Sequence, residues 1–253
     1  MSGEPRQPDP RSQVFLVTGA SRGVGAEVAA QLACPGRHVI VHYREKAKRA
    51  DDVVELVRAA GGDATAAQAD LTDEQAVAAM VDEIERRLGG LDVLVLNASG
   101  GLERGADPGY ATRLNSEAQV RLARLALPLM SAGGRIVFVT SHLAHFYGSK
   151  PVPADYIPVA ASKRAGEEAL REMLETFEGA GITLVVVSGD MIDGSVMVRL
   201  FERRDPEAVA ARRRAGGRLP TAAEFASAIV RATQEEPRHN SETIYVGGQD
   251  YLS

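Results

Sequence analysis

Cysteine is nearly absent from this 253-residue chain, in which Cys34 is the single example. One thiol cannot build an intramolecular disulfide framework, and it leaves no cysteine cluster for zinc or an iron–sulfur centre. No apolar run approaches the ~18 residues that a membrane-spanning helix needs. With a net charge of −5, the chain also lacks the basic surplus expected of a nucleic-acid-binding protein.

The N-terminus lacks the apolar core of a secretory signal. Residues 1–12 are polar and rich in proline, so we expect a disordered leader on a cytoplasmic protein. Lysine is scarce as well and occurs only at positions 46, 48, 150 and 163. Lys163 therefore stands out, because its neighbours are small or apolar.

Short apolar runs alternate with helical patterns from residue 13 to residue 253. This alternation, without a linker or an internal repeat, predicts one α/β domain of the doubly wound Rossmann type. Its sheet should be mostly parallel, with about seven strands. We expect the strands at residues 14–17, 38–43, 65–69, 91–96, 135–140, 182–188 and 243–246.

The Arg-rich segment 190–218 has a helical pattern and no strand, and we interpret it as a lid over the substrate site. Its run Arg212–Arg214 is expected to be a solvated face of this lid. An anion site for a carrier-protein phosphopantetheine or an acidic substrate is the alternative.

The first strand runs directly into a glycine-rich turn and then a helix. Glycines let the backbone approach a pyrophosphate, and the helix N-terminus presents N–H groups and the positive end of its dipole. This order predicts a dinucleotide site, although a merely tight turn is the alternative. The expected cofactor contacts here are Gly19, Ser21, Arg22, Gly23, Val24 and Gly25.

The end of the second strand reads Tyr43-Arg44 and contains no acid. Sites that prefer NAD place an acidic residue there to bind the ribose 2′-hydroxyl. Arg22 and Arg44 could instead hold a 2′-phosphate, because guanidinium groups suit phosphate oxygens. The sequence therefore favours NADP(H), with Tyr43 beside it. Arg44 as a solvated loop charge is the alternative.

Two further strand ends carry candidate cofactor residues. Asp70, followed by Leu71, is placed to accept a hydrogen bond from an adenine amino group, unless it is the N-cap of the next helix. The fourth strand ends in Asn97-Ala98-Ser99, small residues that admit a flat ligand.

The stretch from Tyr156 to Lys163 is the most informative one for chemistry. Proline suits the first helical turn, so a helix should begin near Pro158, with Tyr156 just before it and Lys163 two turns inside. The lysine could point back toward the tyrosine. An ammonium beside a phenol lowers the phenol's pKa and makes it a usable acid or base. A core tyrosine and an unrelated surface lysine are the alternative.

Nearly the whole chain resembles the short-chain dehydrogenase/reductase superfamily. The resemblance rests on these motifs and on their order and spacing: Thr18-Gly19-x3-Gly23-x-Gly25, Asp70-Leu71, Asn97-Ala98, Asn115, Ser141, Ser162-Lys163, Ser188-Gly189 and Val246-Gly247-Gly248. It implies a nicotinamide cofactor and hydride transfer at a carbonyl or an activated double bond. A homodimer or homotetramer is also expected.

The resemblance implies roles for individual residues. Ser141 would hold the substrate oxygen, and Asn115 would anchor a water in a proton relay. Lys163 would bind the nicotinamide ribose and lower the pKa of the proton donor. Cofactor contacts would also come from Gly189, Met191 and Ile192.

Several positions depart from the family pattern. Val159 stands where the family's tyrosine lies, four residues before the lysine, and Asp193 stands where a threonine often contacts the cofactor. The segment between Asn97 and Asn115 is also short. The Tyr156-x6-Lys163 spacing is similar to that of enoyl-acyl-carrier-protein reductases, among which a NADPH-dependent subset keeps a regular glycine motif. Phe146 matches an aromatic residue that those enzymes carry ten positions before the tyrosine.

We therefore predict a NADPH-dependent reductase of a ketone or enone, with carbonyl reduction favoured over enoyl-thioester reduction and Tyr156 as proton donor. One alternative takes the proton from a substrate hydroxyl, or from water held by Ser141, His142 or His145. Another is a NADP(H)-binding sensor without turnover. The two histidines are not spaced with acids for a metal, so no metal is expected.

Overall fold

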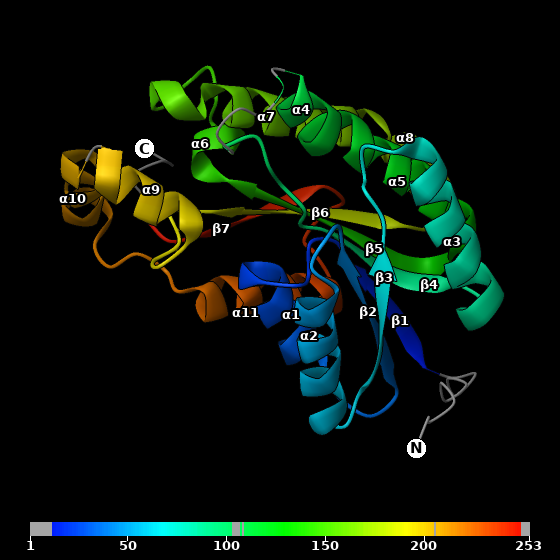
Figure 1. The fold of residues 1–253 in the computed structure, drawn as a ribbon. Coiled ribbons are helices and arrows are strands. Elements are labelled where there is room, and N and C mark those ends of the chain that lie inside the picture. Colours follow the sequence, from blue (N-terminus) through cyan, green and yellow to red (C-terminus); the bar gives the residue numbers. More distant parts are fainter. Residues whose placement is uncertain (1–11, 103–106, 108, 205, 249–253) are drawn as a thin grey trace.

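A computed structural model describes residues 12–102, 107, 109–204 and 206–248 (Figure 1). Its centre is one seven-stranded sheet in the order β3-β2-β1-β4-β5-β6-β7, in which every neighbouring pair is parallel. The predicted fold class is confirmed. The strands are β1 (Gln13–Val17), β2 (Arg37–Tyr43), β3 (Asp63–Gln68), β4 (Leu91–Leu96), β5 (Met130–Ser141), β6 (Thr183–Gly189) and β7 (Glu242–Val246).

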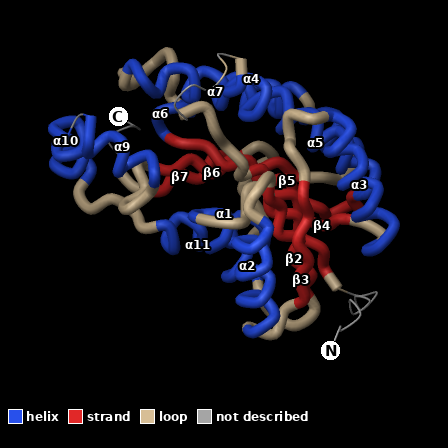
Figure 2. Tube along the Cα trace, viewed as in Figure 1, coloured by secondary structure: helices blue, strands red, loops and turns tan. Residues whose placement is uncertain are grey.

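Helices cover both faces of the sheet (Figures 1 and 2). One face carries α1, α2 and α11, and the other carries α3, α5, α7 and α8. None of the helices in the described ranges is long and apolar enough to cross a bilayer. The helices are α1 (Gly23–Leu32), α2 (Ala47–Ala59), α3 (Glu74–Leu88), α4 (Tyr110–Thr112), α5 (Ala118–Ala126), α6 (His142–His145), α7 (Ile157–Glu172), α8 (Leu174–Gly179), α9 (Val196–Arg204), α10 (Pro206–Gly216) and α11 (Ala222–Gln234).

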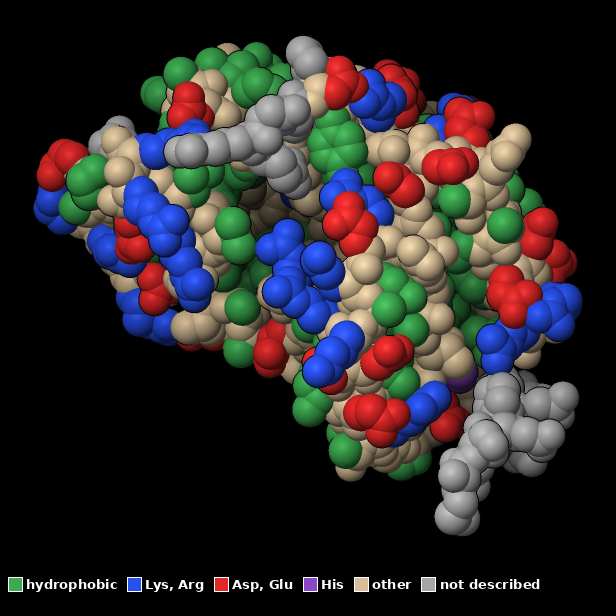
Figure 3. Space-filling model, viewed as in Figure 1, with side chains coloured by type: hydrophobic (Ala, Val, Ile, Leu, Met, Phe, Trp, Pro, Cys, Tyr) green, Lys and Arg blue, Asp and Glu red, His purple; other side chains and the backbone are tan. Residues whose placement is uncertain are grey.

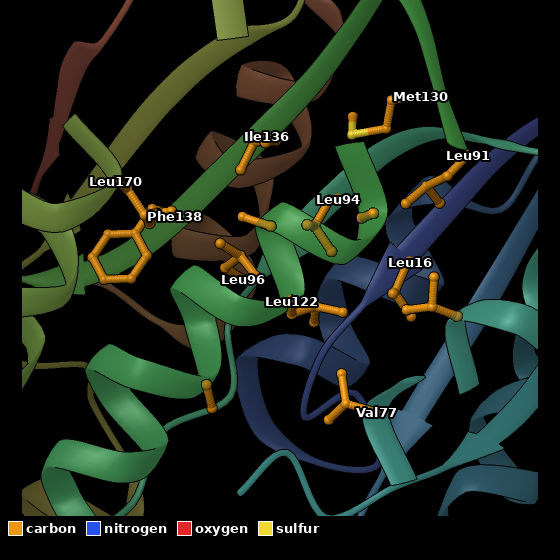
Figure 4. Close-up of a cluster of buried hydrophobic side chains, with 14 of the residues drawn as sticks. Leu16, Val77, Leu91, Leu94, Leu96, Leu122, Met130, Ile136, Phe138 and Leu170 are labelled. Carbon is orange, nitrogen blue, oxygen red and sulfur yellow. The ribbon is translucent and has the colours of Figure 1, made fainter. Parts of the chain in front are cut away.

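Alternate side chains of each strand enter opposite cores. Leu16 of β1 packs in the core under α3, α5 and α7, whereas its neighbours Phe15 and Val17 pack in the core under α1, α2 and α11. Figure 4 shows the first of these, where Leu94 of β4 and Phe138 of β5 point toward the helices. Because both faces of the central strands are covered, β1, β4 and β6 contain nearly continuous buried apolar runs, which is why such runs located them. The edge strand β3 is more polar, and only Ala64 in it is buried.

One predicted boundary was wrong, and so was the alternative role of Asp70. The strand expected to begin at residue 135 begins at Met130, directly after the helical turn that ends at Leu129. A break at Met173 separates α7 from α8. Asp70 is not the N-cap of α3, because Asp73 holds that place and accepts hydrogen bonds from two backbone N–H groups.

The segment interpreted as a lid is helical, as expected. Helices α9 and α10 lie together at one side of the molecule, near the carboxyl ends of β6 and β7 (Figure 1). Val198, Phe201 and Val209 of these helices pack with Tyr156 and Val159 in a third apolar cluster. The lid therefore rests on the start of α7.

Helix α7 approaches the preceding helical segment unusually closely. Residues Arg113–Glu117 form a π-helical turn between α4 and α5. A Cβ on Gly166 of α7 would lie 2.4 Å from the backbone oxygen of Asn115 and 3.1 Å from Cα of Ser116. Glycine is required here because backbone atoms cannot move aside as a flexible side chain can.

This contact makes a prediction about stability. Gly166→Ala should lower the free energy of unfolding by about 1–3 kcal/mol, because overpacking outweighs the better helix propensity of alanine. Gly179→Ala in α8 is the matched control, since a Cβ there has nothing within 4 Å. Urea unfolding of both variants measures the difference. Equal stability of the two variants would contradict the close contact.

Candidate active site and cofactor cleft

A cavity of about 610 Å³ opens at the carboxyl edge of the sheet. Ligands of open parallel sheets bind at this edge. Figure 3 shows the hollow between the lid and the body of the molecule, with basic side chains gathered at its edge. Of the predicted cofactor residues, these line it: Gly19, Ser21, Arg22, Gly23, Val24, Gly25, Tyr43, Arg44, Asp70, Leu71, Asn97, Ala98, Ser99 and Ile192.

The glycine turn fits tightly against the loop after β4. A Cβ on Gly25 would lie 2.6 Å from both Nδ2 of Asn97 and the backbone oxygen of Gly19. Thr18 fixes the same loop, because its Oγ1 accepts hydrogen bonds from the backbone N–H groups of Asn97 (2.8 Å) and Ala98 (3.0 Å). The small residues that the sequence singled out on these two loops therefore pack against one another.

The start of α1 is open to an anion. Gly23, its first residue, has φ +58°, and a Cβ there would meet nothing within 4 Å. The helix has no side-chain N-cap and no acid in its first turn. Its first N–H groups and positive dipole end can therefore face a phosphate. Together with the flat, small-residue loop after β4, these features fit a dinucleotide.

Five basic side chains line the cavity, and two of them were predicted. Arg22 and Arg44 are joined by Lys46, Arg49 and Arg199, which the sequence analysis missed. A signal existed for Lys46 and Arg49, since they follow Arg44 closely at the start of α2. Arg199 had none, because its place depends on how the lid packs. The guanidinium of Arg44 bonds the hydroxyl of Tyr110 and lies over its ring, 5.7 Å from the centroid.

Ser141 and Tyr156 are brought together by two different elements. Ser141 ends β5, and Tyr156 is the N-cap of α7, with Pro158 in the first turn as predicted. Their hydroxyl oxygens lie 3.2 Å apart. Tyr156 is 4% exposed. Burial raises the pKa of its phenol, and the hydrogen bond with Ser141 opposes that rise.

Lys163 is buried two turns inside α7, and burial lowers the pKa of its ammonium to about 8. Among the described residues, no hydrogen bond or ion pair involves this ammonium. The expected contact with the phenol of Tyr156 is therefore absent, and Ser141 is the hydrogen-bond partner of that phenol.

Asn115 and Val159 complete the inner part of the site. The side-chain amide of Asn115 donates to the backbone oxygen of Gly100 (2.9 Å) and to Oγ of Ser162 (3.0 Å), and it accepts from the N–H of Gly100. Its side chain is thus occupied by protein groups, and the proton relay stays a prediction. Val159 is 2% exposed and packs under the lid, so no ionisable group replaces the family's tyrosine there.

Other predicted residues do not reach the cavity. Lys163, Gly189 and Met191 are not part of its lining, and the N–H of Met191 bonds Oδ1 of Asp190 at 2.7 Å. Their cofactor contacts stay predictions. Of the two histidines, His142 bonds Oγ of Ser188 (2.8 Å) and His145 lies between Glu167 (2.9 Å) and Tyr245 (3.0 Å). No metal-binding group of three or more His, Cys, Asp or Glu occurs in the described ranges.

A second cavity, of about 650 Å³, lies between the edge strand β3 and α3. Its lining includes His38, Thr65 and Met80, but none of the residues of the glycine turn. Ser141 and Tyr156 line neither of the two cavities, so the residues of the glycine turn decide between them. The chemistry therefore points to the first cavity as the functional cleft.

Comparison with known proteins identifies the class. The family model for short chain dehydrogenases matches residues 13–205, and the chain belongs to this family. Among curated relatives, a 1-cyclohexenylcarbonyl-CoA reductase of Streptomyces collinus is 37% identical over 191 residues, 72% of this chain and 66% of the relative. A hydroxynaphthalene reductase of Aspergillus fumigatus is 35% identical over 184 residues, 70% of this chain and 65% of the relative. The chain thus spans just under two thirds of the length of these relatives.

A solved structure extends the similarity to almost the whole chain. The angucycline C-6 ketoreductase LanV, solved with bound NADP, superposes with a TM-score of 0.79 at 27% identity. The match covers 99% of this chain and 100% of that one. The predicted NADP(H) cofactor agrees with the NADP bound in that structure.

The buried ammonium gives a prediction that separates structure from function. Lys163→Met should raise the Tm of the cofactor-free protein by several degrees at pH 7, since a buried charge costs up to roughly 3 kcal/mol here. Because the folded-state pKa of about 8 lies below the ordinary lysine pKa of 10.5, this gain should be full below pH 8 and shrink as the pH rises toward 10.5. Thermal unfolding across pH measures it.

The same variant should lose most of the Tm increase that NADPH gives. Lys48→Met in α2 is the control, because Lys48 is exposed and neither property should change. A Tm below that of the parent protein would instead show that the Lys163 ammonium supports the fold.

Proposed function

We propose that this chain is an NADP(H)-dependent reductase of ketones or enones, in which Tyr156 and Ser141 hold the substrate oxygen. The observation that carries the proposal is the pair of hydroxyl groups 3.2 Å apart, buried under the lid. It supports Tyr156 as the replacement for the tyrosine that the family has at the position of Val159.

The cleft supplies partners for each part of the cofactor. The N-terminus of α1 would face the pyrophosphate, and Asp70 the adenine amino group. Arg22 and Arg44 would hold the 2′-phosphate, supported by Lys46 and Arg49, which line the same end of the cavity. Bound NADPH would supply the hydride. The excess of cations where NAD sites have an acid is what supports NADP(H).

Tyr156 acts as the acid in this proposal. The phenol is protonated at neutral pH, because its ordinary pKa is about 10 and burial raises that pKa further, so it can donate to the substrate oxygen. In a ketone it protonates the oxygen as the carbonyl carbon is reduced. In an enone its hydrogen bond stabilises the enolate oxygen while the β-carbon is reduced. Ser141 bonds the same oxygen and orients it.

Helix α9 of the lid must move aside before substrate reaches Tyr156. The ring of Phe201 in α9 lies edge-on to that of Tyr156, with 6.1 Å between centroids. Tyr156 is consequently almost sealed from solvent. Substrate has to displace α9, and the returning lid then excludes water from the reacting oxygen.

Enoyl-thioester reduction is the second candidate. It is favoured by the Tyr-x6-Lys spacing and by the similarity to a 1-cyclohexenylcarbonyl-CoA reductase. Carbonyl reduction is favoured by the hydroxynaphthalene reductase and the C-6 ketoreductase. Both chemistries use the same hydrogen bond from Tyr156 to an oxygen, so the active-site residues do not separate them.

Removing the phenol hydroxyl tests the acid. Tyr156→Phe should lower kcat by ~10²-fold or more while leaving the Kd for NADPH unchanged. Tyr147→Phe is the control, since Tyr147 is exposed and should tolerate the change. Turnover close to that of the parent protein would shift the proton source to a substrate hydroxyl or to water held by Ser141, His142 or His145.

The substrate class is tested by NADPH consumption with matched panels of cyclic ketones and enoyl thioesters. We expect kcat/KM to be at least about tenfold higher for ketones, a difference of about 1.4 kcal/mol in transition-state binding. The reverse ranking would establish the enoyl-thioester alternative. Tight NADPH binding with no turnover in either panel would identify a sensor.

A further inference from the structure

The arginines of the lid are not equivalent. Most are held in ion pairs, and the run Arg212–Arg214 is paired throughout, so it offers no anion site. Arg212 is also buried, which contradicts the expected solvated face. The pairs are Arg204 with Asp155, Arg212 with Asp190, Arg213 with Asp193 and Glu202, Arg214 with Glu207 and Arg218 with Glu224.

Two arginines of α9 differ from the rest. Arg199 and Arg203 make no ion pair with any described residue, although they lie one helical turn apart. Arg199 lines the cofactor cavity, together with the preceding residues 192–196, whereas Arg203 does not. The orientation of α9 is fixed by Val198 and Phe201, which are buried against the start of α7. The position of Arg199 at the cavity thus follows from the packing of the helix.

The charge of Asp193 would otherwise oppose an anion in this part of the cavity. Asp193 lines the cavity at the place where a threonine often contacts the cofactor. Its carboxylate accepts a hydrogen bond from Arg213 at 3.0 Å. Arg213 is shared with Glu202, so it balances the charge of Asp193 only in part, and Arg199 adds a positive charge that no carboxylate of the described residues pairs with.

The sheet order indicates which phosphate Arg199 can meet. Arg44, Lys46 and Arg49 follow β2, on one side of β1. Arg199 belongs to the segment after β6, which lies beyond β4 and β5 on the other side of β1. The N-terminus of α1, which follows β1, lies between these two sides. A dinucleotide that spans the cavity has its 2′-phosphate at the β2 end and its pyrophosphate at the middle.

We propose that Arg199 is a phosphate ligand carried by the lid, which bonds the cofactor's pyrophosphate opposite the N-terminus of α1. This inference rests on the proposed NADP(H) function. Because Arg199 and Phe201 belong to the same helix, the bound cofactor holds α9 over Tyr156. Cofactor binding thereby favours the closed substrate site before hydride transfer.

Binding of NADPH without substrate tests the proposal. By fluorescence titration, Arg199→Gln should raise the Kd about tenfold or more, whereas the matched variant Arg203→Gln should change it less than about twofold. Both variants should keep the Tm of the parent protein, since neither side chain is buried or ion-paired. Equal Kd values for the two variants would overturn the role of Arg199.

A second ligand distinguishes the phosphates. Adenosine 2′-monophosphate carries the 2′-phosphate but no pyrophosphate, and its displacement of NADPH should give the same Ki with Arg199→Gln as with the parent protein. A parallel loss of affinity for this ligand would assign Arg199 to the 2′-phosphate and overturn the pyrophosphate contact. Failure of the parent protein itself to bind NADPH would contradict the proposed function rather than the role of Arg199.

Discussion

The site depends on the close contact between α7 and the π-helical turn around Asn115. Gly166 lets the two backbones meet, and the amide of Asn115 then ties Gly100, in the loop after β4, to Ser162 of α7. One side chain thus connects the cofactor loop and the helix that carries Tyr156 and Lys163. If this contact were looser, the position of the Ser141–Tyr156 hydroxyl pair relative to the glycine turn would no longer be fixed.

The same helix explains how a tyrosine can be displaced from its usual position. Tyr156 is the N-cap of α7 and the last residue of the 3-10 turn Ala154–Tyr156, and its backbone is close to helical, with φ −98° and ψ −12°. Its ring can fold over the start of the helix and reach Ser141, which is itself the N-cap of α6. Val159, one turn later, fills the space beneath the lid with an apolar group. A proton donor at the N-cap therefore needs no side chain at the family's position.

Much of this arrangement could be read from the sequence because it follows from local rules. Strands buried on both faces are apolar runs, and the turn that leads from such a strand into a helix requires glycine. Gly19 and Gly25 are required by close contacts, and Gly23 by its positive φ. The hydroxyl pair of Ser141 and Tyr156 was expected as two separate candidates. Their contact could not be derived, because it depends on how the loop between them closes.

The errors have a common physical source. The expected approach of Lys163 to Tyr156 followed from the tendency of long helical side chains to point toward the start of the helix, which gives direction but not reach. Arg199 and the burial of Arg212 depend on tertiary packing of the lid, and Asp73 replaced Asp70 as a cap through a local competition among nearby polar residues. Sequence periodicity carries no information about which of several arginines finds a carboxylate.

In the lid, α10 is held by a buried ion pair, whereas α9 carries the exposed side chain of Arg199. At its root, Arg212 forms a two-pronged ion pair with Asp190, whose side chains are 8% and 2% exposed. Asp190 also accepts from the backbone N–H groups of Met191 (2.7 Å) and Gly248 (3.1 Å). Breaking such a buried pair leaves an uncompensated charge and costs about 3–5 kcal/mol, so α10 stays attached to the end of β6.

Among the described residues, helix α9 has no buried ion pair. Apolar contacts and the exposed ion pair of Arg204 with Asp155 hold it against the start of α7. Apolar contacts are non-directional and can form again after the helix has moved, whereas a buried ion pair cannot shift without leaving its charges uncompensated. Substrate access is therefore expected to involve α9 rather than α10. That division would keep the end of β6, with Asp190 and Met191, fixed while the cover over Tyr156 opens.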